Sequence, residues 1–399
     1  MPGQSVATII GGPCLITYRG GTFRSKGDVR LNMELTTFAI ETSLYGQVDE
    51  RVSEHPLVLS FEPDGEWTNL PVLWPYASTP FGTFITPQVP VASIGSNQMN
   101  VGSTAVLLSG DDIVFQVQGN GSIANGITAG NVYYLHVVDA SHISIHTTYA
   151  NAVAGVNPVA ISAGTGNTIG VINNPLTIQS LDGYLWTFYN AAVSKMPALR
   201  LSTVQTAVGP VEFNCYLADG QDWNTGSSLY NITANPYPGD TGFNPSSILT
   251  GEIQAVWRNM VAPWSLFDTK NGWEVDFAMS LERVEVDNVG LVTHRLSNLV
   301  VTAKAQPLGV NINDVATAML LQGSGSFRGR SLAATGNDLL LSATANNLGC
   351  KIFNAALRGG PAQWSNKLDR IGQLTWIATR TFSSTGPNPL FSIGNTQVT

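Results

Sequence analysis

The chain has 399 residues, of which 43% are hydrophobic and only 12% are charged, and its formal net charge is −8 at pH 7. The charged fraction is about half of the ~25% usual in soluble domains, yet no apolar run approaches the ~18 residues of a membrane-spanning helix. A negative chain without a basic tail also argues against a protein that grips nucleic acid through its phosphates. We therefore expect no membrane partner, and a surface that is largely buried in an assembly.

The cysteines and the first residues bear on the compartment. Cys14, Cys215 and Cys350 are odd in number and far apart, which fits buried thiols in a reducing compartment better than a disulfide framework. The opening MPGQSVATII has no basic stretch before an apolar one, so we predict no secretory signal peptide.

The first predicted elements are a hairpin and a long strand. Residues 12–25 carry CLITY and TFRS on either side of a double-glycine turn, which is typical of a β-hairpin. A strand then begins at Val29. Its apolar face holds Val29, Leu31, Met33 and Leu35, and its polar face holds Arg30, Asn32, Glu34 and Thr36. After Thr37 the apolar positions shift to Phe38 and Ile40, which predicts a bulge or a change of packing partner.

The middle of the chain changes character. Residues 43–56 are polar and charged and predict a long loop, followed by the strand LVLSF and a short helix within residues 67–77 that prolines limit. Residues 87–173 contain short strands rich in Gly, Ser, Asn and Thr, with a hairpin around Ala140. They predict a small inserted β domain, because insertions are tolerated at exposed loops. Residues 218–250 predict a turn-rich connector.

The chain contains the segment that begins at Val29 twice. At an offset of 246 residues, Val29, Met33 and Leu35 correspond to Val275, Met279 and Leu281. At an offset of 244, Gly46, Val48, Arg51, Pro63 and Gly65 correspond to Gly290, Val292, Arg295, Pro307 and Gly309. FYNAAV at 188–193 and GPVEF at 209–213 return as IFNAAL at 352–357 and GQLTW at 372–376. Collinear blocks indicate a duplication. We attribute the two-residue difference to a loop deletion, and the fall of the offset from 244 to 164 to the insert.

These patterns predict a mainly β fold of the α+β class, with two tandem repeats, one short helix in each repeat, and an inserted all-β domain. The predicted divisions are residues 1–86 with 174–217 for the first repeat, 87–173 for the insert, 218–250 for the connector and 251–399 for the second repeat. The second helix is expected in NDVATAMLLQ, with Asn313 as its N-cap and Gly323 after its end. The second repeat also shifts its apolar phase, between Leu281 and Val284.

Motifs for catalysis or metal binding are weak. GSGSFRG at 323–329 follows a predicted helix and lacks the P-loop lysine, so it favours a turn. His142 and His146 stand ~13 Å apart on a strand at ~3.3 Å per residue, too far to share one ion, and with His136 they are predicted at the surface. A glycosidase pair would need two carboxylates about 5–9.5 Å apart across a cleft, and the candidates fall in predicted loops: Asp49, Glu50, Asp64 and Glu66. We predict no enzyme, no catalytic residue, no cofactor and no metal.

Six phrases of the first repeat resemble the major tail tube proteins of long-tailed bacteriophages. They are TFRSKGDV (22–29), YGQVDER (45–51), SFEPDGEW (60–67), LWPYASTPFGT (73–83), LDGYLWTFYNAAVSKMP (181–197) and TAVGPVEF (206–213). Their collinearity carries the resemblance, which covers roughly residues 10–86 and 174–216. The second repeat matches more weakly and lacks the Trp-Pro-Tyr.

The resemblance implies a two-sheet fold of the tail tube β-sandwich or barrel type, whose inner strands join a continuous β barrel around a channel. It also implies stacked rings through which the genome passes, and an insert that decorates the outside. The implied partners are other copies of the chain, transiently passing double-stranded DNA, and the tape measure, terminator and distal tail proteins. The implied location is the virion, after assembly in the host cytoplasm.

A tube of this kind gives the polar strand faces a role. We expect them to line the channel and to carry a charge of −2 per chain, a weak repulsion that keeps DNA sliding. The residues are Arg30, Asn32, Glu34, Thr36, Asp276, Ala278, Ser280 and Glu282. Loops that reach the next ring would contain Gln47, Asp49, Glu50, Arg51, Asp287, Asn288, His294 and Arg295. Since each chain carries two tube domains, we expect homotrimeric rings, with a hexamer as the alternative.

Two other functions remain open. A tail hub or distal tail protein would use the same fold once per virion, and the copy number per particle separates it from a tube protein. A carbohydrate-binding β protein would stack sugars on tyrosines of the insert, and the candidates are Tyr133, Tyr134 and Tyr149. A glycan array would test that reading, whose competitor is simple hairpin packing.

Overall fold

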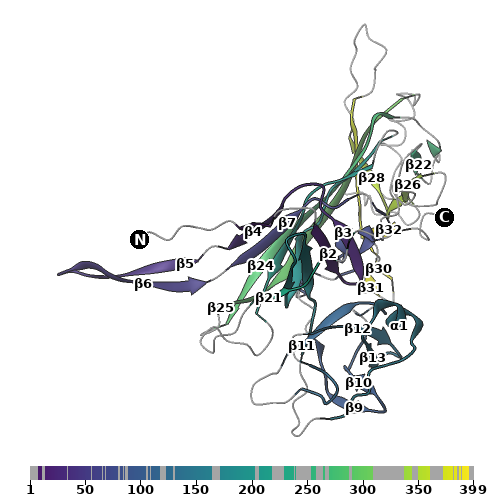
Figure 1. The fold of residues 1–399 in the computed structure, drawn as a ribbon. Helices are drawn as coiled ribbons and strands as arrows, with labels where there is room; N and C mark the ends of the chain where they lie inside the picture. Colours follow the sequence, from purple (N-terminus) through teal and green to yellow (C-terminus); the bar gives the residue numbers. More distant parts are fainter. Residues whose placement is uncertain are drawn as a thin grey trace.

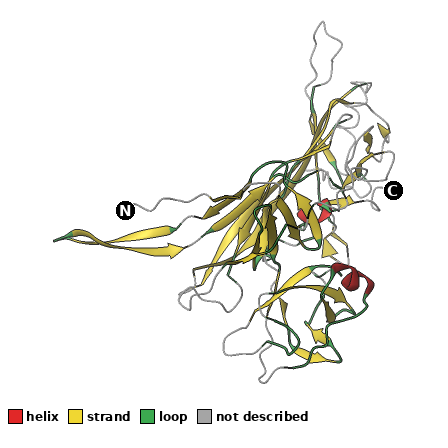
Figure 2. Ribbon diagram, in the orientation of Figure 1, coloured by secondary structure: helices red, strands yellow, loops and turns green. Residues whose placement is uncertain are grey.

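The structure is a computed structural model, and the part of the chain that it describes forms antiparallel β-sheets with one short α-helix (Figures 1 and 2). The mainly β class predicted from the sequence is therefore confirmed. The described residues are 8–10, 14–33, 35–54, 56–64, 66–67, 69–79, 81–83, 85, 89–104, 107, 109–116, 123–128, 131–163, 171–202, 206–217, 229–237, 239, 253–257, 264–265, 269–286, 290–308, 337–343, 349–359, 372–380, 382–383, 386–387 and 389–394.

The first repeat contains two five-stranded sheets, which we call its front and back sheets. The front sheet has the order β1 (Thr8–Ile10), β4 (Val29–Met33), β7 (Leu57–Phe61), β20 (Val211–Cys215) and β17 (Ala191–Lys195). The back sheet has the order β21 (Tyr230–Ala234), β16 (Tyr184–Phe188), β15 (Leu176–Ser180), β2 (Cys14–Tyr18) and β3 (Gly21–Arg24). Burial alternates along β2 and β7, so one face of each sheet turns toward a shared core.

The second repeat has a front and a back sheet of its own. The front sheet has the order β19 (Thr206–Val208), β18 (Leu199–Leu201), β24 (Thr269–Val286), β25 (Gly290–Pro307), β29 (Leu374–Ile377) and β28 (Ala356–Gly359). The back sheet has the order β23 (Trp264–Ser265), β22 (Ile253–Trp257), β26 (Leu339–Ala343), β27 (Gly349–Ile352) and β32 (Phe391–Gly394). A separate two-stranded pair consists of β30 (Phe382–Ser383) and β31 (Gly386–Pro387).

Two strands, β5 (Thr36–Thr42) and β6 (Gly46–Glu54), form a hairpin that we call the arm and that projects away from both repeats (Figure 1). The prediction of a loop over residues 43–56 was therefore wrong. The charged side chains that suggested a loop lie on a strand that solvent surrounds, where polar residues cost nothing. The loop expected to contain His294 and Arg295 was wrong in the same way, because both residues lie on β25.

One strand register occurs in both front sheets. β4 pairs with β7, and β5 pairs with β6. For every residue pair in these two ladders, the two residues numbered 244 higher face each other in β24 and β25. Thus Arg30 faces Ser60 as Glu274 faces Lys304, and Phe38 faces Arg51 as Glu282 faces Arg295. The uniform offset corrects the two-residue deletion inferred from the sequence. Val29 is equivalent to Trp273 rather than to Val275.

The bulges of the two hairpins also coincide. The register shifts between Thr36 and Thr37 and again between Ile40 and Glu41 in the first repeat. The second repeat shifts at the positions 244 residues later, between Ser280 and Leu281 and between Val284 and Glu285. The predicted bulge at the change of apolar phase is therefore confirmed in both repeats. In the first repeat β4 ends at Met33 and β5 begins at Thr36, whereas β24 and β25 are each one long strand.

Matched aromatic pairs join the front and back sheets in each repeat. Tyr18 and Phe213 meet edge to face, with ring centroids 4.8 Å apart at 72°, and Trp257 and Trp376 meet at 6.0 Å and 75°. These residues hold equivalent places in the two pairing schemes. They belong to one hydrophobic core that spans both repeats. Edge-to-face pairs stabilise such a core beyond the area they bury.

The two repeats are joined edge to edge by a short crossover. After β17 the chain passes three residues and enters β18, which pairs with β24 of the second repeat. There β18 holds the place that β1 holds on β4, since Leu201 faces Trp273 as Ile10 faces Val29. The predicted divisions thus need two corrections. Strands β18 and β19 pair within the second front sheet, and β21, from the supposed connector, completes the first back sheet.

Residues from 89 to 173 form a sheet and a core of their own. The sheet has the order β8 (Val89–Pro90), β14 (Val171–Asn173), β11 (Asp112–Gln116), β12 (Val132–Val137), β13 (His142–His146), β10 (Gln98–Asn100) and β9 (Ser93–Gly95). The prediction of an all-β insert was wrong in one respect, because α1 (Tyr149–Ala154) packs beside β12 and β13 (Figure 2). The Thr148 side chain caps the N-terminus of α1 by accepting a hydrogen bond from the Asn151 amide. Gly155 ends the helix in the left-handed conformation, with φ 67°.

The insert is fastened to the turn between β2 and β3. That turn consists of Arg19 and Gly20, one residue before the predicted double glycine, and both have positive φ. Arg19 Nη2 lies 3.1 Å from Asp111 Oδ2 of the insert. A Cβ at Gly20 would stand 2.6 Å from the Gly110 carbonyl oxygen and 2.7 Å from the Tyr149 ring, so only glycine allows this approach.

Other predicted elements have mixed outcomes. The hairpin of β2 and β3 and the hairpin of β12 and β13 are confirmed. The first short helix is present as η1 (Leu70–Leu73), a 3₁₀-helix that begins just before Pro71. The helix predicted between Asn313 and Gly323, and the glycine-rich turn after it, lie outside the described residues.

Replacing Arg19 with methionine should destabilise the protein. Asp111, whose side chain is 3% exposed, would lose its guanidinium partner, and breaking a buried pair from one side costs about 3–5 kcal/mol. We expect a lower midpoint of thermal unfolding by calorimetry. Lys195→Met is the matched control, because its pair with Glu212 is 55% and 37% exposed and should contribute about 0–1 kcal/mol. Equal shifts for the two variants would contradict a structural role for the Arg19–Asp111 pair.

Candidate functional site: the polar face of the front sheets

The face of the front sheets opposite the core is polar in both repeats. On β4, Val29 and Leu31 are buried while Arg30 and Asn32 are exposed. On β24 the buried residues are Trp273, Val275 and Phe277, and the opposite face carries Glu274, Asp276, Ala278 and Ser280. Strand alternation therefore places most of the candidate channel residues on one face of each sheet. Thr36 and Glu282 lie at or beyond the bulges and are exposed, and Glu34 lies outside the described residues.

Cross-strand pairing arranges the charges of this face in rows. One row is Arg30, Ser60, Glu212 and Lys195, and its counterpart is Arg200, Glu274, Lys304 and Thr375. Within the rows, Lys195 Nζ lies 2.8 Å from Glu212 Oε1, and Arg200 Nη2 lies 3.7 Å from Glu274 Oε1. Lys304 Nζ lies 2.9 Å from Asp276 Oδ2 on the neighbouring row. Opposite charges thus alternate across the strands.

These rows change the charge expected for the face. The predicted −2 per chain counted only the residues of two strands. Five further charged side chains lie on this face, three of them basic and two acidic. They are Lys195, Arg200, Lys304, Glu212 and Glu274. Their net charge is positive, so the whole face is closer to neutral than predicted. The pairs are partly exposed and stabilise the fold little. Their effect is to leave few charges of either sign free on this face.

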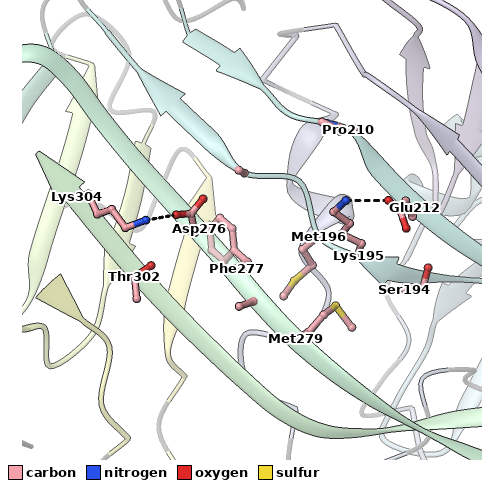
Figure 3. A pocket seen from close by; sticks show the side chains of 12 residues that line it. Ser194, Lys195, Met196, Pro210, Glu212, Asp276, Phe277, Met279, Thr302 and Lys304 are labelled. Atoms are coloured by element: carbon pink, nitrogen blue, oxygen red, sulfur yellow. Dashed lines mark hydrogen bonds and ion pairs between the residues drawn. The ribbon is translucent and has the colours of Figure 1, made fainter. Parts of the chain in front are cut away.

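A groove marks the seam between the two repeats on this face (Figure 3). Its volume is about 790 Å³. Met196, Phe277 and Met279 give it an apolar lining, and the ion pairs Lys195–Glu212 and Asp276–Lys304 lie on either side (Figure 3). The hydrogen bond to Asp276 raises the pKa of Lys304, which therefore stays protonated and cannot act as a base.

The carboxylates considered as a glycosidase pair have structural partners instead. Arg24 Nη1 lies 2.8 Å from Glu66 Oε2 and 3.5 Å from Asp64 Oδ2. Asp49 and Glu50 lie on the exposed arm, away from any described cleft. One guanidinium thus contacts both carboxylates, which gives each of them a structural partner.

The three histidines of the insert have partners among neighbouring side chains and backbone carbonyl groups. Among the described residues, no group of three or more potential ligands gathers. His142 hydrogen-bonds Asp139. Hydrogen bonds from the backbone amide of Ser141 and from the His142 ring lower the pKa of the Asp139 carboxyl to about 2. The prediction of a surface location was wrong for His146, which is fully buried. Its Nε2 lies 2.9 Å from Ser144 Oγ and its Nδ1 2.9 Å from the Val156 carbonyl oxygen.

The tyrosines considered for carbohydrate stacking serve packing. Tyr133 is 7% exposed and meets Phe115 edge to face, with ring centroids 6.1 Å apart. Tyr134 and Tyr149 meet edge to face at 6.2 Å, and Tyr149 also covers the Gly20 turn. A sugar would need an open aromatic face, so burial favours the packing interpretation most clearly for Tyr133, whereas Tyr149 is 49% exposed.

The residues expected in loops to the next ring lie on strands. Gln47, Asp49, Glu50 and Arg51 belong to β6 and are exposed. On β25, Arg295 is exposed, whereas His294 is half-buried and hydrogen-bonds the Tyr216 hydroxyl of the first repeat. Asp287 and Asn288 lie outside the described residues. The equivalent positions Glu50 and His294 therefore have very different surroundings.

Burial makes the cysteines poor nucleophiles. Cys14, Cys215 and Cys350 are buried and free, as predicted from the sequence. Burial raises the pKa of Cys14 to about 11 and that of Cys350 to about 12, and it raises the pKa of Cys215 as well. Because the thiolate is the reactive form, all three thiols stay protonated and unreactive at neutral pH.

We expect no native reactivity toward a thiol-specific disulfide reagent at mildly alkaline pH, because the folded-state pKa values lie far above that pH. In guanidinium chloride all three thiols should react, since unfolding returns each pKa to about 8.5. Absorbance of the released thiol measures both reactions. Fast labelling of any cysteine in the native protein would contradict its assignment as a buried, inert side chain.

Comparisons of the sequence with protein families and with curated proteins add no relative. Among the described residues, no helix is long and apolar enough to cross a membrane. What the chain does is therefore inferred from its own residues and their arrangement. No protein-family model matches the sequence, and no similar curated protein was found.

Proposed function

We propose that this chain is the tail tube protein of a long-tailed bacteriophage. In this proposal its copies close into rings, the rings stack, and the polar faces of the front sheets surround the channel through which the genome passes. The observation that carries the proposal is the duplicated front hairpin, which keeps one register and one set of bulges in both repeats. Two equivalent, adjoining sheets are the arrangement expected of a ring of repeated units.

The edges of the front sheets support closure into a ring. Within the chain, the edge strand β17 is followed by β18, which adds to β24. In the same order of strands, β1 is the edge strand that begins the first front sheet, and β28 is the edge strand that ends the second front sheet. If β28 of one chain lies beside β1 of the next, the contact made once within each chain recurs between chains. A head-to-tail contact of this kind generates a ring when the rotation closes.

The tandem repeat also bears on the number of chains. Three chains supply six equivalent front sheets, so we propose a homotrimeric ring, with a hexamer of chains as the alternative. Such rings bury large surfaces, typically more than ~2,000 Å² in obligate assemblies. The low charged fraction of 12% agrees with a chain whose surface is largely covered by its own copies.

The position of the insert agrees with an external decoration. Arg19 and Gly20, which hold the insert, form a turn of the back sheet, on the side of the core away from the polar face. The insert therefore lies outside the channel in this proposal. The chain has no catalytic role here. Its partners are its own copies and the other tail proteins, and its location is the virion.

The purified chain should polymerise into hollow tubes or stacked rings when it is concentrated. Negative-stain electron microscopy measures this, with the native protein at low concentration as the reference. Single rings that never stack would favour the alternative of a tail hub. A monomer at every concentration would contradict the proposal altogether.

The near-neutral face should let DNA pass because it offers few free cations to the phosphates. Cationic contacts bind DNA by releasing counterions, so the binding weakens as salt rises. We expect particles with Ala278→Lys and Ser280→Lys, both exposed on the polar face of β24, to assemble but to release DNA slowly at low salt. Val138→Lys and Val156→Lys add the same charge on the insert and serve as the control. Equally slow release in both would contradict a channel location for β24.

A further inference from the structure

The arm exposes apolar side chains on a two-stranded hairpin. Among the described residues from 35 to 52, Ile40 is half-buried and all the others are exposed. The exposed apolar residues, with exposed fractions of 50–76%, are Leu35, Phe38, Leu44, Tyr45, Val48 and Val52. A two-stranded hairpin is at best marginally stable in water, and a cluster of exposed apolar residues marks a surface that another molecule covers.

The equivalent half of the second front sheet is already covered. Val52 faces Thr37 in the register in which Leu296 faces Leu281, so the two residues hold the same place. Val52 is 55% exposed, whereas Leu296 is fully buried. One repeat therefore shows this hairpin bare, and the other shows it in contact with a partner.

The partner of the covered hairpin is the first repeat of the same chain. Gly82 donates its amide to the Leu296 carbonyl at 2.7 Å, and Leu296 donates its own amide to the Thr83 carbonyl at 2.9 Å. The Ile85 amide reaches the His294 carbonyl at 2.9 Å. These three backbone hydrogen bonds hold residues 82, 83 and 85 beside β25.

Side chains of the first repeat complete this cover. The Tyr216 hydroxyl hydrogen-bonds His294 Nδ1, and their rings lie 5.7 Å apart. Nearby, Arg380 of the second repeat donates to the Thr79 carbonyl at 3.1 Å and lies over the Phe81 ring. The contact is therefore both polar and apolar, and it joins the two repeats at one seam.

We propose that the arm is the seat for the second repeat of a neighbouring copy of this chain. Glu50 and Val52 hold the places of His294 and Leu296, and among the described residues both are exposed. Along a row of chains the first and second repeats alternate. Within each chain, the first repeat covers the hairpin of the second repeat. The second repeat of one chain then covers the first repeat of the next. This inference rests on the proposed self-association, and it assigns the arm to the lateral seam of a ring rather than to the contact between rings.

The contact between the two repeats of one chain also predicts which residues of neighbouring chains should meet. Pairing of β20 with β7 and of β29 with β25 makes Phe213 equivalent to Trp376, so the residue equivalent to Tyr216 is Thr379. Thr379 is half-buried in this chain and donates to the Asn354 carbonyl at 2.8 Å. By equivalence with the Tyr216–His294 contact, Glu50 of one chain should stand beside Thr379 of its neighbour.

Mixed cysteine variants test this contact. Chains with Glu50→Cys alone are mixed with chains with Thr379→Cys alone, assembled, and treated with a short bifunctional thiol reagent. The buried native cysteines stay silent. We expect a covalent dimer on a denaturing gel from the mixture and none from either variant alone. Moving the first cysteine to Tyr184, which is 48% exposed on the back sheet, should abolish the dimer.

The outcomes separate this inference from the proposed function. Tubes that form without a cross-linked dimer would overturn the lateral seat and leave the tube proposal standing, with the arm then reaching the next ring. Absence of any assembly would overturn both. Tubes together with the dimer support both.

A second variant covers the case in which Thr379→Cys fails to fold. Val52→Asp places a charge in the seat and should weaken ring association at least about tenfold, which corresponds to ~1.4 kcal/mol and to burial of a valine. Val138→Asp, on the insert, is the matched control. Sedimentation over a concentration series measures both variants. Unchanged association of Val52→Asp would contradict burial of the arm between neighbours.

Discussion

The shared register of the two front hairpins is the constraint on which the rest of the molecule depends. Side chains alternate along a strand, so a slip of one residue would turn Arg30 and Asp276 into the core and Val29 and Val275 out of it. Two bulges shift this register at equivalent places in both repeats. The polar face, the matched aromatic pairs of the core and the edge-to-edge junction through β18 all require that register to hold.

Much of the fold follows from the sequence because strand alternation and turn residues are local signals. The alternation of β4 and the phase change after Thr37 predicted a strand and a bulge, and both are present. The arm was missed because its exposed, charged strand β6 lacks a buried face, and only such a face produces alternation. Helix α1 was missed although Thr148 and Gly155 mark its ends, since six residues give a weak periodic signal.

The candidate site was only partly predictable. Alternation placed Arg30, Asn32 and Asp276 on one face, but the charge of that face depends on which strands lie beside them. Lys304 meets Asp276 from β25, and no local pattern indicates this contact. Similarly, nothing in the sequence of β6 or β25 shows that Leu296 is covered while Val52 is bare. Both differences arise from contacts between segments that are distant in the chain.

The central claim is that the two repeats occupy equivalent positions around one channel. The most direct measurement is the number of chains in a ring, obtained by high-resolution electron microscopy of the assembled tube. The account predicts three chains per ring, with β4 and β24 alternating around the channel as six equivalent strands. Six identical chains per ring, or a ring in which only one repeat reaches the channel, would contradict it.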